Sequence, residues 1–269
     1  MHTIKKIAIL GGGNIGTAII TGLTKSGAFK KSDITVTRLP SQPLVDLQKE
    51  GFNATHSNIE AISSADVVII AVQPKQAKQI FSEIKEKLDP KRHTVVSIIS
   101  AFAIDEIEKG LGDKIEIIRV MPNTAIAVCE SMTCISSKNT SSARFEEIKT
   151  IFEKVGKVLV IDEKLMASAT VLAACGTGFF LRIIRAASQG GIQVGFHADE
   201  AQLIAAQVAK GATTLVLETG NHPEVEIDKV TTPMGLTIKG LNEMEHAGLS
   251  SAIIKGIVYS YSEMDKLAK

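Results

Sequence analysis

Along the first 160 or so residues, short apolar runs alternate with stretches in which apolar positions recur with helical spacing. The run at residues 66–72 is almost wholly apolar, which is typical of a parallel strand buried on both faces. We expect further strands at residues 5–10, 33–38, 94–99, 115–120 and 157–161, and helices at 15–26, 76–88, 104–111 and 142–155. Strands that alternate with helices indicate βαβ units, so the pattern predicts an α/β fold with a doubly wound sheet.

The pattern changes near residue 163, after which only long helical patterns remain, at residues 164–190, 198–219, 232–246 and 250–269. Residues 198–219 carry apolar side chains around most of the helix circumference, and a helix of this kind has to be buried. The remaining chain is too short to cover it, so a second subunit is the economical partner. We therefore predict one domain at residues 1–162 and an all-helical dimerisation domain at 163–269, in a homodimer or a larger oligomer of dimers.

Composition narrows the function classes. The 269 residues are 45% hydrophobic with a net charge of +1 and 4% aromatic residues, so neither disorder nor a nucleic-acid partner is expected. The apolar run at residues 7–10 is too short for a secretory signal, and the uncharged run at 165–181 is shorter than the ~20 residues of a membrane span. With three scattered cysteines, we expect a cytoplasmic protein without a membrane segment, disulfide scaffold or bound metal.

A glycine-rich segment directly follows the first predicted strand and opens the first predicted helix. Gly11, Gly13 and Gly16 fit G-x-G-x-x-G, a pattern that gains its meaning from this context. In such a turn the first glycine permits the sharp bend, the second lets a pyrophosphate approach, and the third lets helix and strand pack closely. The free N–H groups at the helix start then face the phosphates. The segment predicts a Rossmann-type NAD(P)-binding domain, against the alternative of a glycine turn without a nucleotide.

The second predicted strand bears on the choice of cofactor. An NAD site usually has Asp or Glu at the end of this strand, where it binds the ribose hydroxyls. This chain instead has Arg38, followed by Ser41, and these offer a cation and a hydrogen-bond donor for a 2′-phosphate. We therefore expect NADPH to be favoured over NADH, against the alternative that Arg38 is a solvated loop arginine.

Several segments resemble the pyrroline-5-carboxylate reductase family, in order along essentially the whole chain. They are the glycine turn, Ala71-Val72-Gln73-Pro74, Met121-Pro122-Asn123-Thr124, His222-Pro223 and the stretch from Val230 to Thr237. The last of these is the most specific, because general dinucleotide-binding folds do not share it. The resemblance implies an NAD(P)H-dependent enzyme that reduces the cyclic imine 1-pyrroline-5-carboxylate to L-proline, the last step of proline biosynthesis.

The resemblance also implies roles for individual residues. It places Asn58 near the adenosine, the segment from Ala71 to Pro74 along the pyrophosphate and nicotinamide ribose, and Ile98 to Ser100 beside the nicotinamide. Together with the glycine turn, the expected cofactor-binding residues are Leu10, Gly11, Gly12, Gly13, Asn14, Ile15, Gly16, Arg38, Asn58, Ala71, Val72, Gln73, Pro74, Ile98, Ile99, Ser100 and Lys229. The expected substrate-binding residues are Glu163, Gly235, Leu236 and Thr237, of which Thr237 is also the expected catalytic residue.

Elementary chemistry is consistent with these roles. Backbone N–H groups where the turn from Pro233 to Thr237 begins a helix can bind the substrate carboxylate without a dedicated arginine. The Thr237 hydroxyl can bond the imine nitrogen. A protonated iminium is already electrophilic, so hydride transfer mainly needs positioning. The alternative for Thr237 is a threonine that caps its own helix.

The chain departs from the family pattern at three places. The usual Gly-Ser-Gly-Pro-Ala run reads Ala-Cys-Gly-Thr-Gly at residues 174–178, the usual Pro-Gly-Gly turn has Met234 in its middle, and Ala125 replaces a proline. A bulky residue at Met234 matters where a turn needs positive φ. Two alternatives follow: a related NADPH-dependent imine or 2-oxo acid reductase, or a non-catalytic NADPH-binding relative. A β-hydroxyacid-type dehydrogenase is disfavoured, because residues 165–190 lack the lysine and asparagine that its chemistry uses.

Overall fold

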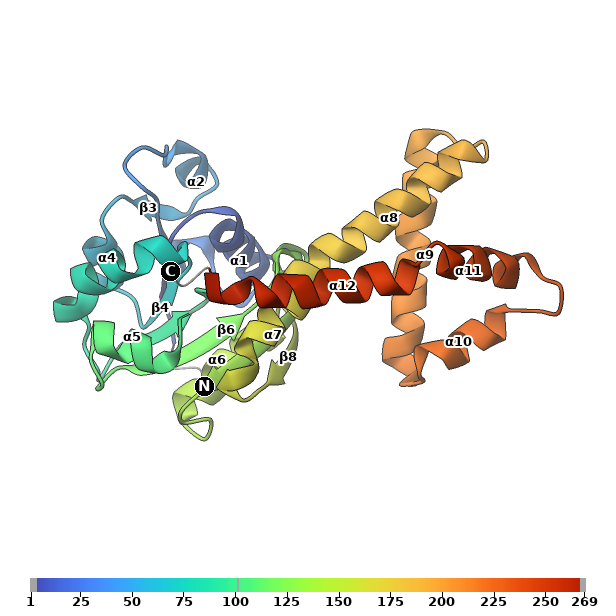
Figure 1. Ribbon diagram of the computed structural model, residues 1–269. Helices are drawn as coiled ribbons and strands as arrows, with labels where there is room; N and C mark the ends of the chain where they lie inside the picture. Colours follow the sequence, from blue (N-terminus) through green and yellow to red (C-terminus); the bar gives the residue numbers. More distant parts are fainter. Residues whose placement is uncertain (1–3, 101, 267–269) are drawn as a thin grey trace. The chain divides into compact units, whose positions relative to one another are not determined.

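The computed structural model describes residues 4–100 and 102–266, without the side chain of residue 265 (Figure 1). Its contacts form two compact units. The first consists of the described residues up to Thr177 together with those from Ser260 onward, and the second is Gly178–Tyr259. Each unit is described by itself below. The functional boundary expected between residues 162 and 163 stays a prediction.

The described residues of the first unit form one eight-stranded sheet in the order β3-β2-β1-β4-β5-β6-β7-β8. Neighbouring strands are parallel except β6 and β7, which are antiparallel. The strands are β1 (Ile7–Leu10), β2 (Ile34–Thr37), β3 (Asn53–Thr55), β4 (Val67–Ile70), β5 (Thr94–Ser97), β6 (Glu116–Met121), β7 (Ser131–Ser137) and β8 (Gly156–Val160). The chain order reverses between β1 and β4, as in a Rossmann-type fold, so the predicted α/β class is confirmed.

Helices cover both faces of this sheet (Figure 1). They are α1 (Asn14–Lys25), α2 (Val45–Lys49), α3 (Asn58–Ser63), α4 (Pro74–Ile84), α5 (Ile104–Leu111) and α6 (Ala143–Glu153). In β1, Ile7 and Ile9 join one hydrophobic cluster with α1 and α6, while Ala8 and Leu10 join another with α3, α4 and α5. Burial on both faces is why this strand is an unbroken apolar run.

Four elements lack an apolar pattern that would predict them: β3, α2, α3 and β7. The most instructive is β7, which is rich in serine and threonine yet almost wholly buried. The hydroxyls of Ser131 and Thr133 lie 3.0 Å apart and hydrogen-bond each other, which satisfies both inside the core. Hydropathy alone therefore misses this strand.

The helical run expected at 164–190 is present but irregular. It consists of the 3₁₀ turn η4 (Glu163–Leu165), α7 (Met166–Ala169), the π-helical segment η5 (Thr170–Cys175) and α8 (Gly176–Gln193). Within the described chain, Glu163–Gln193 is the one helical run long and apolar enough to cross a membrane by length and composition. The expected lack of a membrane segment therefore stays a prediction.

The second unit is helical, as predicted. After α8 come α9 (Ala198–Thr219), α10 (Pro223–Val230), α11 (Leu236–His246) and α12 (Leu249–Ser262), whose last residues belong to the first unit, followed by η6 (Met264–Lys266). The helix expected at 250–269 thus ends at Ser262, and residues 267–269 lie outside the described chain. Helix α10 was not expected, because its opening Pro223 suggests a loop; His222 caps it by accepting the Glu224 N–H at 3.3 Å.

The helical unit leaves its apolar residues uncovered. Within Gly178–Tyr259, all of which is described, only Ser188 and Ala201 are buried. On α9, Leu203 and Leu217 are each 70% exposed and Val208 is 65% exposed. Single exposed leucines are ordinary, but a continuous apolar helix surface marks an interaction site.

Candidate functional site

The turn after β1 requires glycine at two positions. Gly11 has φ +111°, and a Cβ there would overlap the Ala71 carbonyl oxygen. A Cβ on Gly16 would overlap the Gly11 carbonyl oxygen, so α1 packs onto the turn only with glycine at this place. Gly13, by contrast, has no heavy atom within 4 Å of where its Cβ would be. The open space lies at the glycine that the dinucleotide pattern assigns to the pyrophosphate.

The N-terminus of α1 is free to bind an anion. Gly13 is its N-cap, and no side chain caps the first turn. Because the first N–H groups of a helix have no partner within the helix, they and the positive dipole end suit a phosphate. A cavity of about 450 Å³ lies at this turn, lined by Gly12, Gly13, Asn14, Thr17, Arg38, Gln42 and Pro43. These residues fit the diphosphate and ribose of a dinucleotide.

A relay of hydrogen bonds supports the glycine turn from the sheet side. The Gly11 N–H donates to the Thr37 hydroxyl at 3.2 Å, and that hydroxyl donates to Asn58 Oδ1 at 2.8 Å. Asn58 Nδ2 in turn donates to Glu83 at 2.9 Å. Both ends of the Asn58 amide are thus engaged, Oδ1 by Thr37 and Nδ2 by Glu83, while its expected adenosine contact stays a prediction.

Arg38 lies beside the same turn and is not a solvated loop arginine, since its side chain is only 13% exposed. Its Nε donates to the Gly12 carbonyl at 3.1 Å, and its Nη1 donates to the Pro43 carbonyl at 2.8 Å. Nη1 also bonds both carboxylate oxygens of Asp46 at 2.7 Å. The hydrogen bond from Arg38 holds the pKa of Asp46 below its usual range, so the carboxylate is ionised at neutral pH.

Two further predicted segments lie at the same edge of the sheet. The Ala71 N–H donates to the Leu10 carbonyl at 2.8 Å, and the Ile98 N–H donates to the Ile70 carbonyl at 3.1 Å. The carboxyl ends of β1, β4 and β5 are therefore adjacent. The structure brings together the glycine turn, Arg38, the segment from Ala71 to Pro74 and the segment from Ile98 to Ser100 at the crevice where open α/β sheets bind ligands.

Glu163 is engaged by its own unit. Its Oε1 accepts hydrogen bonds from the Ile104 N–H at 2.6 Å and from Arg119 Nη1 at 3.1 Å. The Arg119 side chain is only 8% exposed, and burial lowers the pKa of its guanidinium. The carboxylate therefore fixes the start of α5, the helix that follows the expected nicotinamide segment. Sequence reasoning missed Arg119: an arginine inside a predicted buried strand signals a buried ion pair but does not identify the acidic partner.

The expected substrate turn lies in the second unit. The Gly235 N–H donates to the Thr232 carbonyl at 2.8 Å, and Met234 has φ +62°. With Pro233 before it, this is the pattern of a type II turn, in which the third position favours glycine. Met234 thus occupies a left-handed position at a conformational cost of about 1 kcal/mol.

Thr237 is the second residue of α11 and is exposed. The N-cap of this helix is Gly235, which uses no side chain, and the Thr237 hydroxyl has no hydrogen-bond partner among the described residues. The capping alternative is therefore wrong. Lys229 lies in the same unit and pairs with Glu226 at 2.8 Å, which leaves its expected cofactor contact a prediction.

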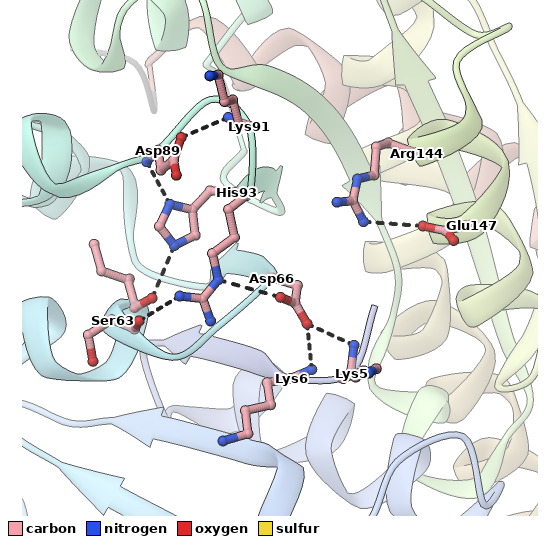
Figure 2. A network of polar contacts seen from close by, with 11 residues as sticks. Lys5, Lys6, Ser63, Asp66, Asp89, Lys91, His93, Arg144 and Glu147 are labelled. Atoms are coloured by element: carbon pink, nitrogen blue, oxygen red, sulfur yellow. Dashed lines mark hydrogen bonds and ion pairs between the residues drawn. The ribbon is translucent and has the colours of Figure 1, made fainter. Parts of the chain in front are cut away.

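The opposite edge of the first unit is structural (Figure 2). Asp66 accepts the N–H groups of Lys5 and Lys6 at 2.8 and 3.0 Å; burial would raise the pKa of Asp66, but these bonds outweigh it and lower that pKa. His93 Nδ1 accepts the Asp89 N–H at 2.7 Å, and its Nε2 faces the Ile62 carbonyl at 3.1 Å. Neither here nor anywhere else among the described residues do three His, Cys, Asp or Glu side chains gather as metal ligands would.

Family models match most of the chain. Residues 163–267 match the model "Pyrroline-5-carboxylate reductase dimerisation", and residues 6–101 match "NADP oxidoreductase coenzyme F420-dependent".

Among curated proteins, the chain is 46% identical to pyrroline-5-carboxylate reductase 1 of Dictyostelium discoideum, over 94% of this chain and 48% of that protein. The chain thus spans about half the length of that relative. It is 45% identical to pyrroline-5-carboxylate reductase 2 of the same organism, over 97% of this chain and 93% of that protein.

Two solved structures are similar over their whole length. One is the Plasmodium falciparum pyrroline carboxylate reductase with NADP bound, with a TM-score of 0.89 and 23% identity over 100% of both chains. The other is a pyrroline-5-carboxylate reductase from Coxiella burnetii, with a TM-score of 0.85 and 29% identity, again over 100% of both chains.

Proposed function

The chain belongs to the pyrroline-5-carboxylate reductase family, and from this premise we propose that it reduces 1-pyrroline-5-carboxylate to L-proline with hydride from NADPH. The observation that carries the proposal is the glycine turn at the free start of α1, with open space at Gly13 and Arg38 beside it. This reaction completes proline biosynthesis, and NADH is the alternative donor.

The chain's own residues would bind and orient both partners. The first-turn N–H groups of α1 bind the pyrophosphate, and Arg38 binds the 2′-phosphate. When bound, NADPH supplies a hydride from the nicotinamide C4 to the imine carbon. The segments Ala71 to Pro74 and Ile98 to Ser100 position the nicotinamide, and Glu163 holds the second of them through Ile104.

The substrate groups come from the helical unit in this proposal. Backbone N–H groups at the start of α11 bind the carboxylate, next to Gly235 and Leu236. The free hydroxyl of Thr237 bonds the ring nitrogen, which orients the C=N bond for hydride attack. The reduced ring nitrogen keeps its proton, so no further acid group is needed.

We also propose that the chain works as a cytoplasmic homodimer formed by the helical unit, with larger oligomers built from such dimers. Support comes from the match to a dimerisation model over residues 163–267 and from the uncovered apolar side chains of α9. A partner copy is the simplest cover for a surface of this kind.

The test of the activity measures NADPH oxidation by the loss of NADPH absorbance. The substrates are 1-pyrroline-5-carboxylate, a panel of cyclic imines and a panel of 2-oxo acids. Rapid oxidation with the pyrroline acid, and formation of proline, is the expected result. Preference for another imine or for a 2-oxo acid would point instead to changed specificity at Met234 or residues 174–178. Binding of NADPH without any turnover would indicate a non-catalytic relative.

A further inference from the structure

We propose that Asp46 limits the preference of this chain for NADPH over NADH, by competing with the 2′-phosphate for the guanidinium of Arg38. The inference rests on the proposed function, because it assumes that the glycine turn binds NAD(P)H. It assigns a specificity role to a residue that lies outside the glycine motif and beyond the end of the second strand.

The contacts of Arg38 define what an incoming phosphate would meet. Nη1 donates to both carboxylate oxygens of Asp46, and Nε donates to the Gly12 carbonyl. Nη2 has no hydrogen-bond partner in the part of the chain that the structure describes. The guanidinium therefore already carries one anion, on one branch of its fork, where a bidentate phosphate would use two.

The two members of this ion pair differ in freedom. The Arg38 side chain is 13% exposed and is held by two backbone carbonyls, whereas the Asp46 side chain is 56% exposed. Loss of Asp46 thus leaves Arg38 anchored by Gly12 and Pro43. This argues against a role for Asp46 in positioning the arginine, and makes the carboxylate the partner that a ligand displaces.

Charge gives the direction of the effect. The cavity at the glycine turn is lined by Arg38, Gln42 and Pro43, so the end of β2 and the loop after it border the place where the adenosine ribose binds in this fold. A 2′-phosphate at Arg38 would lie near the Asp46 carboxylate, and two anions on one guanidinium repel each other. NADH lacks this phosphate and does not meet the conflict. Asp46 therefore weakens NADPH binding selectively.

The experiment compares binding of NADP⁺ and NAD⁺ to the full-length protein by isothermal titration calorimetry, so that no turnover is needed. Asp46→Asn removes the charge and keeps the shape, and Asp46→Ser is a second variant should the amide reform the same contact. Glu50→Gln is the matched control, since it removes one negative charge from an exposed residue at the end of the same helix. Thermal melting checks the fold of each variant.

Both Asp46 variants should bind NADP⁺ roughly 3–10-fold more tightly at low salt, with the gain shrinking as salt rises, and NAD⁺ within about two-fold of the parent. Glu50→Gln should change neither affinity. If the parent binds both nucleotides and the Asp46 variants leave the NADP⁺ affinity unchanged or weaken it, the inference is wrong while the proposed function stands. If the parent binds neither nucleotide, the proposed function fails and the inference fails with it.

Discussion

Nη1 of the buried Arg119 lies 3.1 Å from Oε1 of Glu163, and the same carboxylate oxygen accepts the Ile104 N–H that begins α5. One acidic side chain thus neutralises a buried cation and fixes the helix that follows the expected nicotinamide segment. Removing it leaves a buried guanidinium without its partner, which is costlier than losing a surface ion pair.

Glu163→Ala should therefore lower the free energy of unfolding by about 2–3 kcal/mol, discounted from the cost of a fully buried pair because Glu163 is 30% exposed. Urea denaturation measures this change. Lys138→Ala is the control, because it breaks only the surface pairs with Asp105 and Glu108. The free energy of unfolding of this variant should equal that of the parent within experimental error. Equal effects of the two substitutions would contradict the buried-pair interpretation.

Thr237→Ala tests the expected substrate contact. It keeps the backbone N–H groups of α11 and removes one free hydroxyl, so kcat/KM should fall roughly 10–100-fold while NADPH affinity stays the same. Thr150→Ala on α6, where the hydroxyl only bonds the Glu146 carbonyl, should change neither quantity. A Thr237 variant with parental kcat/KM, or with weakened NADPH binding, would remove this residue from the substrate site.

Leu203→Glu on α9 should abolish the dimer, because it places a charge in the apolar surface expected at the interface. Light scattering at micromolar concentration should give a dimer mass for the parent and a monomer mass, or aggregates, for the variant. Gln202→Glu adds the same charge to a neighbouring face of α9 and should keep the dimer. A monomeric parent would contradict the predicted assembly.

His93 predicts a dependence of stability on pH. Burial lowers the pKa of His93 below its ordinary value of about 6.5, because the charged imidazolium is poorly solvated there. Protonation would also turn Nδ1 into a donor that faces the Asp89 N–H, which it accepts in the neutral form. Below pH 6.5 the unfolded chain binds a proton that the folded chain resists. The contribution of neutral His93 is therefore fully present above this pH and is lost as the pH falls below it.

Urea denaturation at pH 7.5 and pH 5.5 measures that effect. His93→Gln, which cannot gain a proton, should show a smaller loss of stability between these conditions than the parent. His246→Gln, at an exposed position of α11, should lose as much as the parent. An identical loss in His93→Gln would exclude this histidine as the source.

The sequence predicted the parts of the fold in which apolar spacing is unbroken. Residues 104–111 and 198–219 are helices with the bounds expected, and the central strands lie where continuous apolar runs are. Strand β7 was not predicted because its buried side chains include several hydroxyls, two of which, Ser131 and Thr133, satisfy each other. Helix α10 was not predicted because proline opens a helix as readily as it forms a loop.

The candidate site was predictable as far as backbone chemistry determines it. Gly11 and Gly16 are required by close approach, so their pattern is visible in the sequence. The partners that hold the functional side chains are not: Thr37, Asp46 and Arg119 reach Gly11, Arg38 and Glu163 through contacts between residues far apart or across a loop. Such contacts depend on the assembled sheet and leave no local pattern.

The most direct test of the central claim is the fate of hydride in the reaction of 1-pyrroline-5-carboxylate with NADPH that carries deuterium at the transferred position of the nicotinamide C4. Mass spectrometry of the product should show L-proline that carries one deuterium on the ring carbon of the former C=N bond, formed in step with NADPH oxidation. Unlabelled proline, or oxidation of NADPH without proline, would contradict the assignment of this chain as a pyrroline-5-carboxylate reductase.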